Sequence, residues 1–190
     1  LVNKSREIIR PLFRSNITIN SKYDNTPVTE ADRKTEVALR KIISNNYPDH
    51  GIHGEEYPPL NVDSQFQWVI DPIDGTKAFI SGKPNFGTLI GLGLKGRPVL
   101  GVLDQPIIKD RFIGSRNGTT LNKQQIKTRS CQHLAEAVYS ITDPRMMTSS
   151  TQKAVLQKLM RTTHITQFGG NCYAYGLLAA GGIDLITEND

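Results

Sequence analysis

The segment Trp68-Val-Ile-Asp-Pro-Ile-Asp-Gly-Thr76 combines the residue types of this chain that are best suited to chemistry. An apolar run of strand type leads into two carboxylates three residues apart, Asp71 and Asp74, and then into a glycine and a threonine. Pro72 cannot donate a ladder hydrogen bond and has a fixed φ, so we expect the strand to end near Asp71. The pattern therefore predicts a strand that places two carboxylates at its carboxyl end.

Gly75 and Thr76 predict that a helix begins directly after these carboxylates. Glycine tolerates a tight backbone, and Thr76 would open the helical turn. A helix N-terminus presents free N–H groups and the positive end of a dipole, which favour an anion such as phosphate. Two acids beside that anion then require a cation between them and the phosphate. The alternative is a solvated Asp-Gly turn, because both residues are common in turns.

Two further acidic segments lie upstream. We expect Thr29 to cap a helix, with Asp32 three residues later, where a capping box usually has Glu or Gln. The alternative role of Asp32 is only to satisfy the helix start. Glu55 and Glu56 follow a short predicted strand over residues 51–54, and a solvated charge pair is the alternative for them.

Together, Asp32, Glu55, Asp71 and Asp74 form an all-oxygen set without a matching group of Cys or His. Two carboxylates about 4 Å apart repel by about 1 kcal/mol in water and by about 4 kcal/mol at an effective dielectric constant of about 20. A fold brings several of them together only with cations between them. Such oxygens suit Mg²⁺, with Mn²⁺ as an alternative, and nothing resembles a zinc site. The residues thus predict metal-dependent phosphate chemistry.

In their order and spacing, Pro27-Val-Thr-Glu-Ala-Asp32, Gly54-Glu-Glu56 and Asp71-Pro-Ile-Asp-Gly-Thr76 resemble motifs of the inositol monophosphatase superfamily, whose members are magnesium-dependent phosphatases. Three segments, Gly75–Phe79, Pro84–Leu89 and Phe168–Ala179, are most similar to its histidinol-phosphate phosphatase branch. The resemblance covers the whole chain. It implies an α+β fold, a layered αβαβα sandwich with mixed sheets and an active site between two subdomains.

The resemblance also implies a role for each candidate residue, with two or three Mg²⁺ ions in the site. Metal ligation is implied for Glu55, Asp71, Asp74 and the main-chain oxygen of Ile73. Thr76 and Asp32 would activate the attacking water, and the amides of Gly75 and Thr76 would bind the phosphate. A bound metal lowers the pKa of its water, so no side-chain nucleophile is expected.

Two residues near the end of the chain are implied to contact the rest of the substrate. Glu188 is one, and its alternative is an ordinary carboxylate at a strand end. Asn171 is the other, and it stands where the histidinol-phosphate branch is expected to carry Asp. At about 4 Å the lost attraction to a substrate cation is on the order of 1–4 kcal/mol. The family also supplies a metal-ligating Asp shortly after Glu188, and its absence leads us to expect a longer protein.

The hydrophobic pattern predicts two subdomains that share one cleft, over residues 1–136 and 137–190. The second would be only the start of a C-terminal α/β subdomain. Helices are expected at residues 2–13, after Thr29, after Ser149 and at 171–180, and Pro11 should kink or end the first of them. Strands are expected at residues 88–94, 98–104, 111–114, 119–121, 138–141, 165–168 and 183–186. Glycines at 87, 91, 93 and 101 predict close packing of a layer over the sheet.

The formal net charge is +5, and residues 123–161 contain seven Lys or Arg and two acids. This stretch would attract anionic substrates, or it is only a solvated face. Binding of nucleic acid is not expected, because no RNA- or DNA-binding motif is present. Cys131 and Cys172 lack the spacing of a disulfide framework, and no signal peptide or membrane-spanning run occurs. We therefore expect free thiols, a cytoplasmic location and no membrane partner.

The sequence as a whole predicts a Mg²⁺-dependent phosphomonoesterase that uses metal-activated water. Its substrate would be a small phosphorylated metabolite of the histidinol-phosphate or inositol-monophosphate type. The alternatives are a 3′(2′),5′-bisphosphate nucleotidase and a catalytically inactive homologue that binds phosphorylated metabolites. The family resemblance adds a homodimer as the expected assembly.

Overall fold

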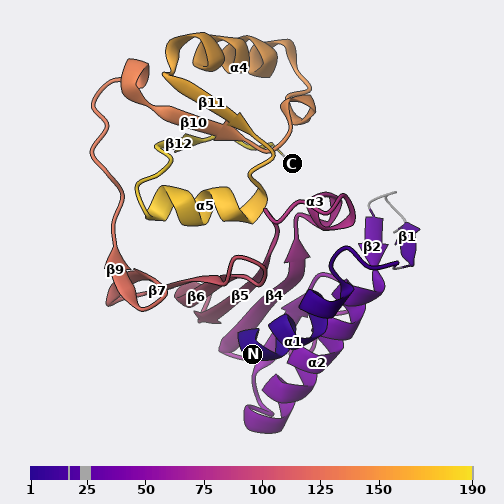
Figure 1. The fold of residues 1–190 in the computed structure, drawn as a ribbon. Helices are drawn as coiled ribbons and strands as arrows, with labels where there is room; N and C mark the ends of the chain where they lie inside the picture. Colours follow the sequence, from indigo (N-terminus) through magenta and orange to yellow (C-terminus); the bar gives the residue numbers. More distant parts are fainter. Residues whose placement is uncertain (17, 22–26, 190) are drawn as a thin grey trace.

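Helices and sheets alternate in layers through the molecule (Figure 1). The computed structural model describes residues 1–16, 18–21 and 27–189. The outer layer consists of α1 (Val2–Leu12) and α2 (Glu30–Asn46), and the next is a seven-stranded sheet in the order β3-β4-β5-β6-β7-β8-β9. Its strands are β3 (Gly51–Gly54), β4 (Phe66–Asp74), β5 (Gly87–Leu94), β6 (Arg97–Gln105), β7 (Asp110–Ser115), β8 (Gly118–Leu121) and β9 (Gln124–Ile126).

The other face of this sheet is covered by α5 (Asn171–Ala179), which also lies under a second sheet (Figure 1). The second sheet is parallel, in the order β11-β10-β12, and α4 covers its outer face. Its elements are β10 (Val138–Ile141), α4 (Ser150–Thr162), β11 (Ile165–Phe168) and β12 (Leu185–Ile186). The short helix α3 (Thr76–Ile80) and the antiparallel pair β1 (Ile19–Ser21) and β2 (Pro27–Thr29) complete the described elements, with 3₁₀ turns at Leu134–Glu136 and Pro144–Met146. The layers confirm the predicted αβαβα sandwich.

Each layer is held by buried apolar side chains. Leu39 and Ile43 of α2 pack on Ile52, Trp68 and Ile70 of the first sheet, and all five are buried. A fully buried side chain of this kind contributes about 1.5–3 kcal/mol. This face therefore fixes α2, and with it the residues at the start of α2, against the sheet.

On the opposite face, α5 approaches the sheet closely. A Cβ at Gly176 would lie 2.6 Å from the ring of Phe112, and one at Gly87 would lie 3.1 Å from Cys172 Sγ. A Cβ at Gly101 would have no neighbour within 4 Å. The prediction that the sheet glycines allow a layer to pack closely thus holds for Gly87 and is wrong for Gly101. It is also wrong for Gly91 and Gly93, where a Cβ would meet only atoms of the neighbouring strands.

The prediction that the strand ends near Asp71 is wrong, because β4 continues through Pro72 to Asp74. Its register with β5 shifts between Asp71, which pairs with Leu89, and Asp74, which pairs with Gly87. Three steps along β4 therefore face two steps along β5, which is a β-bulge. Pro72 is tolerated in this bulge, where it need not donate to the ladder.

The other predicted elements are confirmed, with small differences at their ends. The helix α1 ends at Leu12, one residue after Pro11. The last strand, β12, is shorter than predicted. Asp184, expected inside it, instead accepts hydrogen bonds from Val138 N and from Arg129. The two sheets lie on either side of residue 136, and the division into subdomains at that residue stays a prediction.

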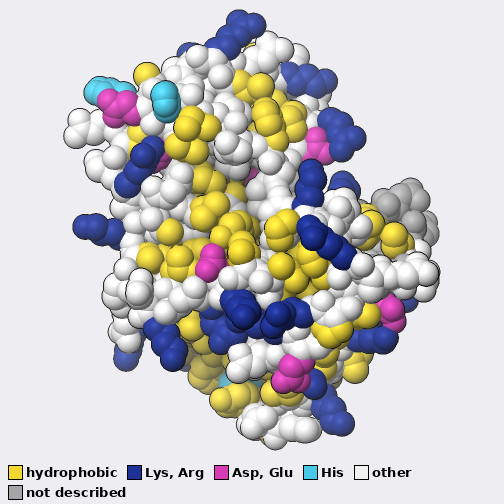
Figure 2. All heavy atoms as spheres, in the orientation of Figure 1, with side chains coloured by type: hydrophobic (Ala, Val, Ile, Leu, Met, Phe, Trp, Pro, Cys, Tyr) yellow, Lys and Arg dark blue, Asp and Glu magenta, His cyan; other side chains and the backbone are white. Residues whose placement is uncertain are grey.

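Charged side chains are unevenly spread on the surface. On the face shown in Figure 2, lysine and arginine side chains lie over both halves, with one group across the lower middle, and acidic side chains lie singly. In the basic stretch 123–161, Arg129 pairs with Asp184 and Arg145 with Asp143, so these two positive charges are partly balanced. In the described part of the chain, no helix is both long and apolar enough to cross a membrane.

The start of α4 offers a test of the local chemistry. Ser149 Oγ accepts from Gln152 N at 3.1 Å, and Gln152 Oε1 accepts from Ser149 N at 2.9 Å. Loss of this cap in Ser149→Ala should lower the free energy of unfolding by about 1 kcal/mol. Ser150→Ala, one residue further on, is the control and should change it by less than about 0.5 kcal/mol. Equal effects in urea denaturation would contradict the cap.

Candidate active site

The acidic motifs meet at one edge of the seven-stranded sheet. Because β3 and β4 are parallel, with Gly54 opposite Ile70, their carboxyl ends lie side by side. Glu55 leaves the end of β3 and Asp71 lies in the last part of β4. The sheet topology therefore brings together acids that are far apart in the sequence.

Asp32 has the capping role considered from the sequence, and its role in activating water stays a prediction. Its Oδ2 accepts from Thr29 N at 2.8 Å and from the Thr29 hydroxyl at 2.6 Å, which completes a capping box at the start of α2. Its Oδ1 is buried and has no hydrogen-bond partner among the described residues. Burial raises the pKa of Asp32, the Thr29 hydrogen bonds oppose this, and the charge of Glu55 adds to it. One oxygen holds the helix, and the other is left to interact with something else.

Asp71 is at the centre of the acidic set. Burial is the largest cause that raises the pKa of Asp71 to about 9, and the charge of Glu55 and a hydrogen bond with Glu55 contribute to the same rise. The charges of Asp74 and Asp32 act in the same direction. Asp71 Oδ1 is buried without a partner in the described structure. Asp71 is therefore less acidic than a solvated aspartate, because burial and the neighbouring acids disfavour its charged form.

These donors match a hard divalent cation by chemical type. They are carboxylate and carbonyl oxygens, and two of them, on Asp32 and Asp71, are buried and unused. Among the described residues, no group of three or more His, Cys, Asp or Glu side chains is arranged as a ready-made metal site. A bound cation would offset the negative charge that burial and the neighbouring acids disfavour on Asp71, so these donors fit such an ion.

Gly75 and the α3 helix follow the acids directly. Gly75 has φ +89°, a left-handed conformation that favours glycine, and precedes the first residue of α3. The Thr76 hydroxyl donates to the main-chain oxygen of Ile73 at 3.1 Å. The predicted helix start is confirmed, and it places the Thr76 hydroxyl against the carbonyl that was predicted to be a metal ligand.

The start of α5, the helix between the two sheets, contacts the loop that carries Asp74. Asp74 Oδ1 accepts from Cys172 N at 2.7 Å. Asn171 has φ +46°, a conformation that Asn tolerates better than most residues, and its Nδ2 donates to Asn85 O at 3.0 Å and to Gly169 O at 3.3 Å. A Cβ at Gly75 would lie 3.0 Å from Asn171 Cγ. Asn171 thus lies beside the acidic loop with its amide on main-chain carbonyls, and its contact with substrate stays a prediction.

Glu188 is connected to Asn171 by a chain of hydrogen bonds. Its Oε1 accepts from Thr142 N at 3.0 Å, and its Oε2 is buried with no partner within the described residues. The Thr142 hydroxyl in turn accepts from Asn171 N at 3.0 Å. Glu188 is therefore linked to Asn171 through Thr142, and no described hydrogen bond links it to the acidic set.

Sequence reasoning missed Glu36 and Arg40, which hold the loop of Glu55. Glu36 is fully buried; its Oε1 accepts from Arg40 Nε at 2.7 Å and its Oε2 from Glu56 N at 2.7 Å. Arg40 Nη2 also donates to Tyr57 O at 2.8 Å. A Cβ at Gly54 would lie 1.9 Å from Glu36 Oε1, so only glycine leaves room there. The available signal was a Glu–Arg pair four residues apart that starts four residues after Asp32.

The model for the inositol monophosphatase family matches residues 1–190. The chain belongs to this family. It is 45% identical to the bifunctional phosphatase IMPL2, chloroplastic, of Arabidopsis thaliana, over 100% of this chain and 55% of that protein. It is 30% identical to a histidinol-phosphatase of Chlorobaculum parvum, over 99% of this chain and 73% of that protein.

Among solved structures of the inositol monophosphatase family, that of an inositol monophosphatase from Zymomonas mobilis has a TM-score of 0.85 and 43% identity, and the match covers 98% of this chain and 72% of that one. The chain spans about half the length of the Arabidopsis relative. The fold and the family are thus shown, and the activity of the whole protein belongs to the proposal below.

The buried Glu36–Arg40 pair can be tested against an exposed pair on the same helix. Glu36→Gln places an amide N–H₂ against Glu56 N–H or Arg40, which should lower the free energy of unfolding by about 1–3 kcal/mol. Glu30→Gln removes the exposed pair with Lys34, also at i,i+4, and should cost less than about 0.5 kcal/mol. Urea denaturation measures both, and a Glu36→Gln variant as stable as Glu30→Gln would show that the pair does not hold the loop.

Proposed function

We propose that the protein is a Mg²⁺-dependent phosphomonoesterase that acts on a small-molecule phosphate ester. The observation that carries this proposal is the buried, unpartnered oxygen of Asp71, held among Glu55, Asp74 and Asp32. Uncompensated burial of a carboxylate is costly, and a site that binds a cation explains why the fold keeps it. A solved IMPase/NADP phosphatase of the same fold, 19% identical, is complexed with Mg²⁺ and phosphate.

The residues divide the work as follows. Glu55, Asp71, Asp74 and the Ile73 carbonyl would hold the cation, which supplies a more acidic water and neutralises charge on the phosphate. Asp32 Oδ1 is the buried acceptor available for a proton from the attacking water, and its raised pKa makes it a stronger base than a solvated aspartate. The left-handed Gly75 lets the main chain approach the phosphate oxygens closely.

We infer an alcohol phosphate of the histidinol-phosphate or inositol-phosphate type as the substrate. The relatives named above as a histidinol-phosphatase and an inositol monophosphatase support this range. The unused Oε2 of Glu188 would accept a hydrogen bond from a substrate hydroxyl or ammonium group. Asn171→Asp should not raise kcat/KM for a cationic substrate. The new carboxylate would lie against the carbonyl oxygens of Asn85 and Gly169, which now accept from the Asn171 amide.

Further details remain part of the proposal. Two or three Mg²⁺ ions, use of Mn²⁺ and a homodimer come from the family resemblance. Cys131 and Cys172 are both free thiols, which supports a reducing compartment such as the cytoplasm.

Release of inorganic phosphate from histidinol phosphate, inositol monophosphate and adenosine 3′,5′-bisphosphate tests the function in the full-length protein. With Mg²⁺ we expect turnover of at least one of the first two, and none after removal of the metal. The kcat/KM values rank the substrates. Turnover of the bisphosphate alone would support the nucleotidase alternative, and absence of turnover on all three would support the inactive homologue.

Asp71→Asn separates the metal site from the fold. The substitution removes one of the mutually repelling acids, so in metal-free buffer the free energy of unfolding should stay unchanged or rise. Metal-dependent phosphate release should fall at least about 10³-fold, which corresponds to about 4 kcal/mol of lost transition-state stabilisation. Asp63→Asn, on an exposed loop, is the matched control and should change neither quantity. Retained activity in Asp71→Asn would contradict the proposed ligand set.

A further inference from the structure

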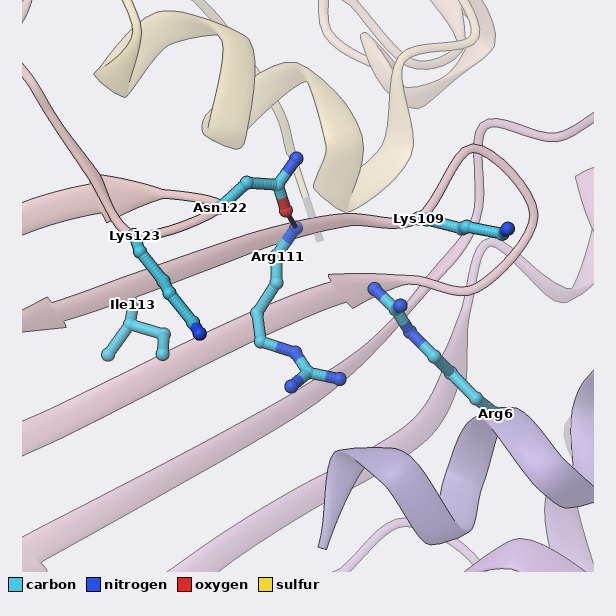
Figure 3. A pocket seen from close by; sticks show the side chains of 6 residues that line it. All are labelled: Arg6, Lys109, Arg111, Ile113, Asn122 and Lys123. Carbon is cyan, nitrogen blue, oxygen red and sulfur yellow. Dashed lines mark hydrogen bonds between the residues drawn. The ribbon is translucent and has the colours of Figure 1, made fainter.

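A pocket of about 240 Å³ lies away from the acidic edge, between α1 and the strands β7 and β8 (Figure 3). It is lined by Arg6, Lys109, Arg111, Ile113, Asn122 and Lys123. Figure 3 shows Arg6 reaching from α1 toward the sheet, with Arg111 and Lys123 coming from the sheet side. The pocket shares no residue with the candidate active site.

A buried carboxylate fixes the two arginines. Asp104 is fully buried; its Oδ2 accepts from Arg6 Nε at 2.6 Å, and its Oδ1 accepts from Arg6 Nη2 at 2.9 Å and from Arg111 Nε at 2.6 Å. Arg111 Nη2 donates to Asn3 Oδ1 at 2.8 Å. One carboxylate thus orients two guanidinium groups and neutralises only one of them. No described hydrogen bond uses the Nη1 atom of either arginine, which leaves each a donor for a ligand.

The lysines of the pocket lie where the backbone disfavours them. Lys109 has φ +68°, and Asn122 and Lys123 form the two-residue turn between β8 and β9 with φ +49° and +73°. Glycine is the preferred residue at the second position of such a turn. Non-glycine residues with positive φ are uncommon, and those at functional sites often keep this conformation for their side chain. Both lysines line the pocket; in Figure 3 Lys123 lies beside Arg111, and the Lys109 side chain extends away from these two residues.

The balance of charge in the pocket is positive. Four cationic side chains line it, and in the described structure the acids hydrogen-bonded to its lining residues are Asp104 and Asp110. Asp110 Oδ1 accepts from Asn122 Nδ2 at 3.0 Å and its Oδ2 accepts from the Tyr173 hydroxyl at 2.8 Å, so both of its oxygens are engaged. An excess of two positive charges therefore remains in a concave site with two oriented guanidinium groups.

We propose that this pocket binds a small phosphate-type oxyanion with two or more negative charges. Oriented guanidinium groups favour planar or tetrahedral oxyanions, which accept several N–H bonds at once. The volume is below the range of about 300–1,000 Å³ that is usual for drug-sized ligands, which favours a phosphate or pyrophosphate group over a whole nucleotide. The proposal does not depend on the proposed phosphatase activity.

Calorimetric titration with pyrophosphate tests the site in the full-length protein, after removal of divalent metals on a chelating resin and at constant ionic strength. Without metal, the acidic edge repels phosphates, so binding reports on the basic pocket. We expect one pyrophosphate per chain. The double variant Lys109→Gly/Lys123→Gly should weaken binding at least tenfold, and it keeps the fold because glycine suits both left-handed positions.

The matched control is Lys95→Gly/Lys153→Gln. Lys95 also has a positive φ, +51°, and the control removes the same amount of charge from outside the pocket. It should bind pyrophosphate within twofold of the wild type. Absence of binding by the wild type, or equal weakening in both double variants, would overturn the proposal. So would a short single-stranded RNA that binds more tightly than pyrophosphate and loses affinity in the pocket variant, since that result assigns the surface to nucleic acid.

Discussion

The mutual repulsion of four acids at the end of β3 and β4 is the constraint to which the surrounding structure responds. Asp71 is buried beside Glu55, Asp74 and Asp32, and the raised pKa of Asp71 reflects both its burial and their charges. Buried oxygens of Asp71 and Asp32 also have no hydrogen-bond partner in the described structure. Groups this unfavourable persist only where the rest of the fold fixes them, which is the pattern of functional sites.

Three devices fix them, and each comes from a different layer. The bulge at Pro72 carries Asp71 and Asp74 out of the regular register of β4. From the outer helical layer, Glu36 and Arg40 bind the main chain after Glu55. From the other side, α5 donates the Cys172 N–H to Asp74. This hydrogen bond couples α5 to the acidic loop, so a displacement of α5 would change the position of Asp74.

Local chemistry could be predicted from the sequence, and contacts between distant segments could not. The caps at Thr29 and Ser149 depend on residues three apart, and both are present. The bulge at Pro72 depends on pairing with β5, which the proline alone does not reveal. Similarly, the surroundings of Gly101 and the left-handed φ of Asn171 are set by the assembled layers.

The same reasoning explains why the candidate residues were found more easily than their supports. Asp32, Glu55, Asp71 and Asp74 fall in short motifs, and the sheet topology that joins them follows from parallel pairing of β3 and β4. In the sequence, Glu36 and Arg40 look like any Glu–Arg pair on a helix. Only the structure shows that Gly54 leaves room for the Glu36 carboxylate. The basic pocket joins residues from positions 6 to 123, which no local motif connects.

The two charged sites also differ in what they can attract. Without a cation, the acidic edge repels a phosphate ester, so its affinity for substrate must be coupled to metal binding. The basic pocket has its positive charge built into Arg6 and Arg111, which the buried Asp104 orients whether or not a metal is bound. Taken together, the two proposals give the chain one anion site that is conditional on a cation and one that is permanent. The net charge of +5 favours approach of anions to both, and only the local side chains decide which site holds them.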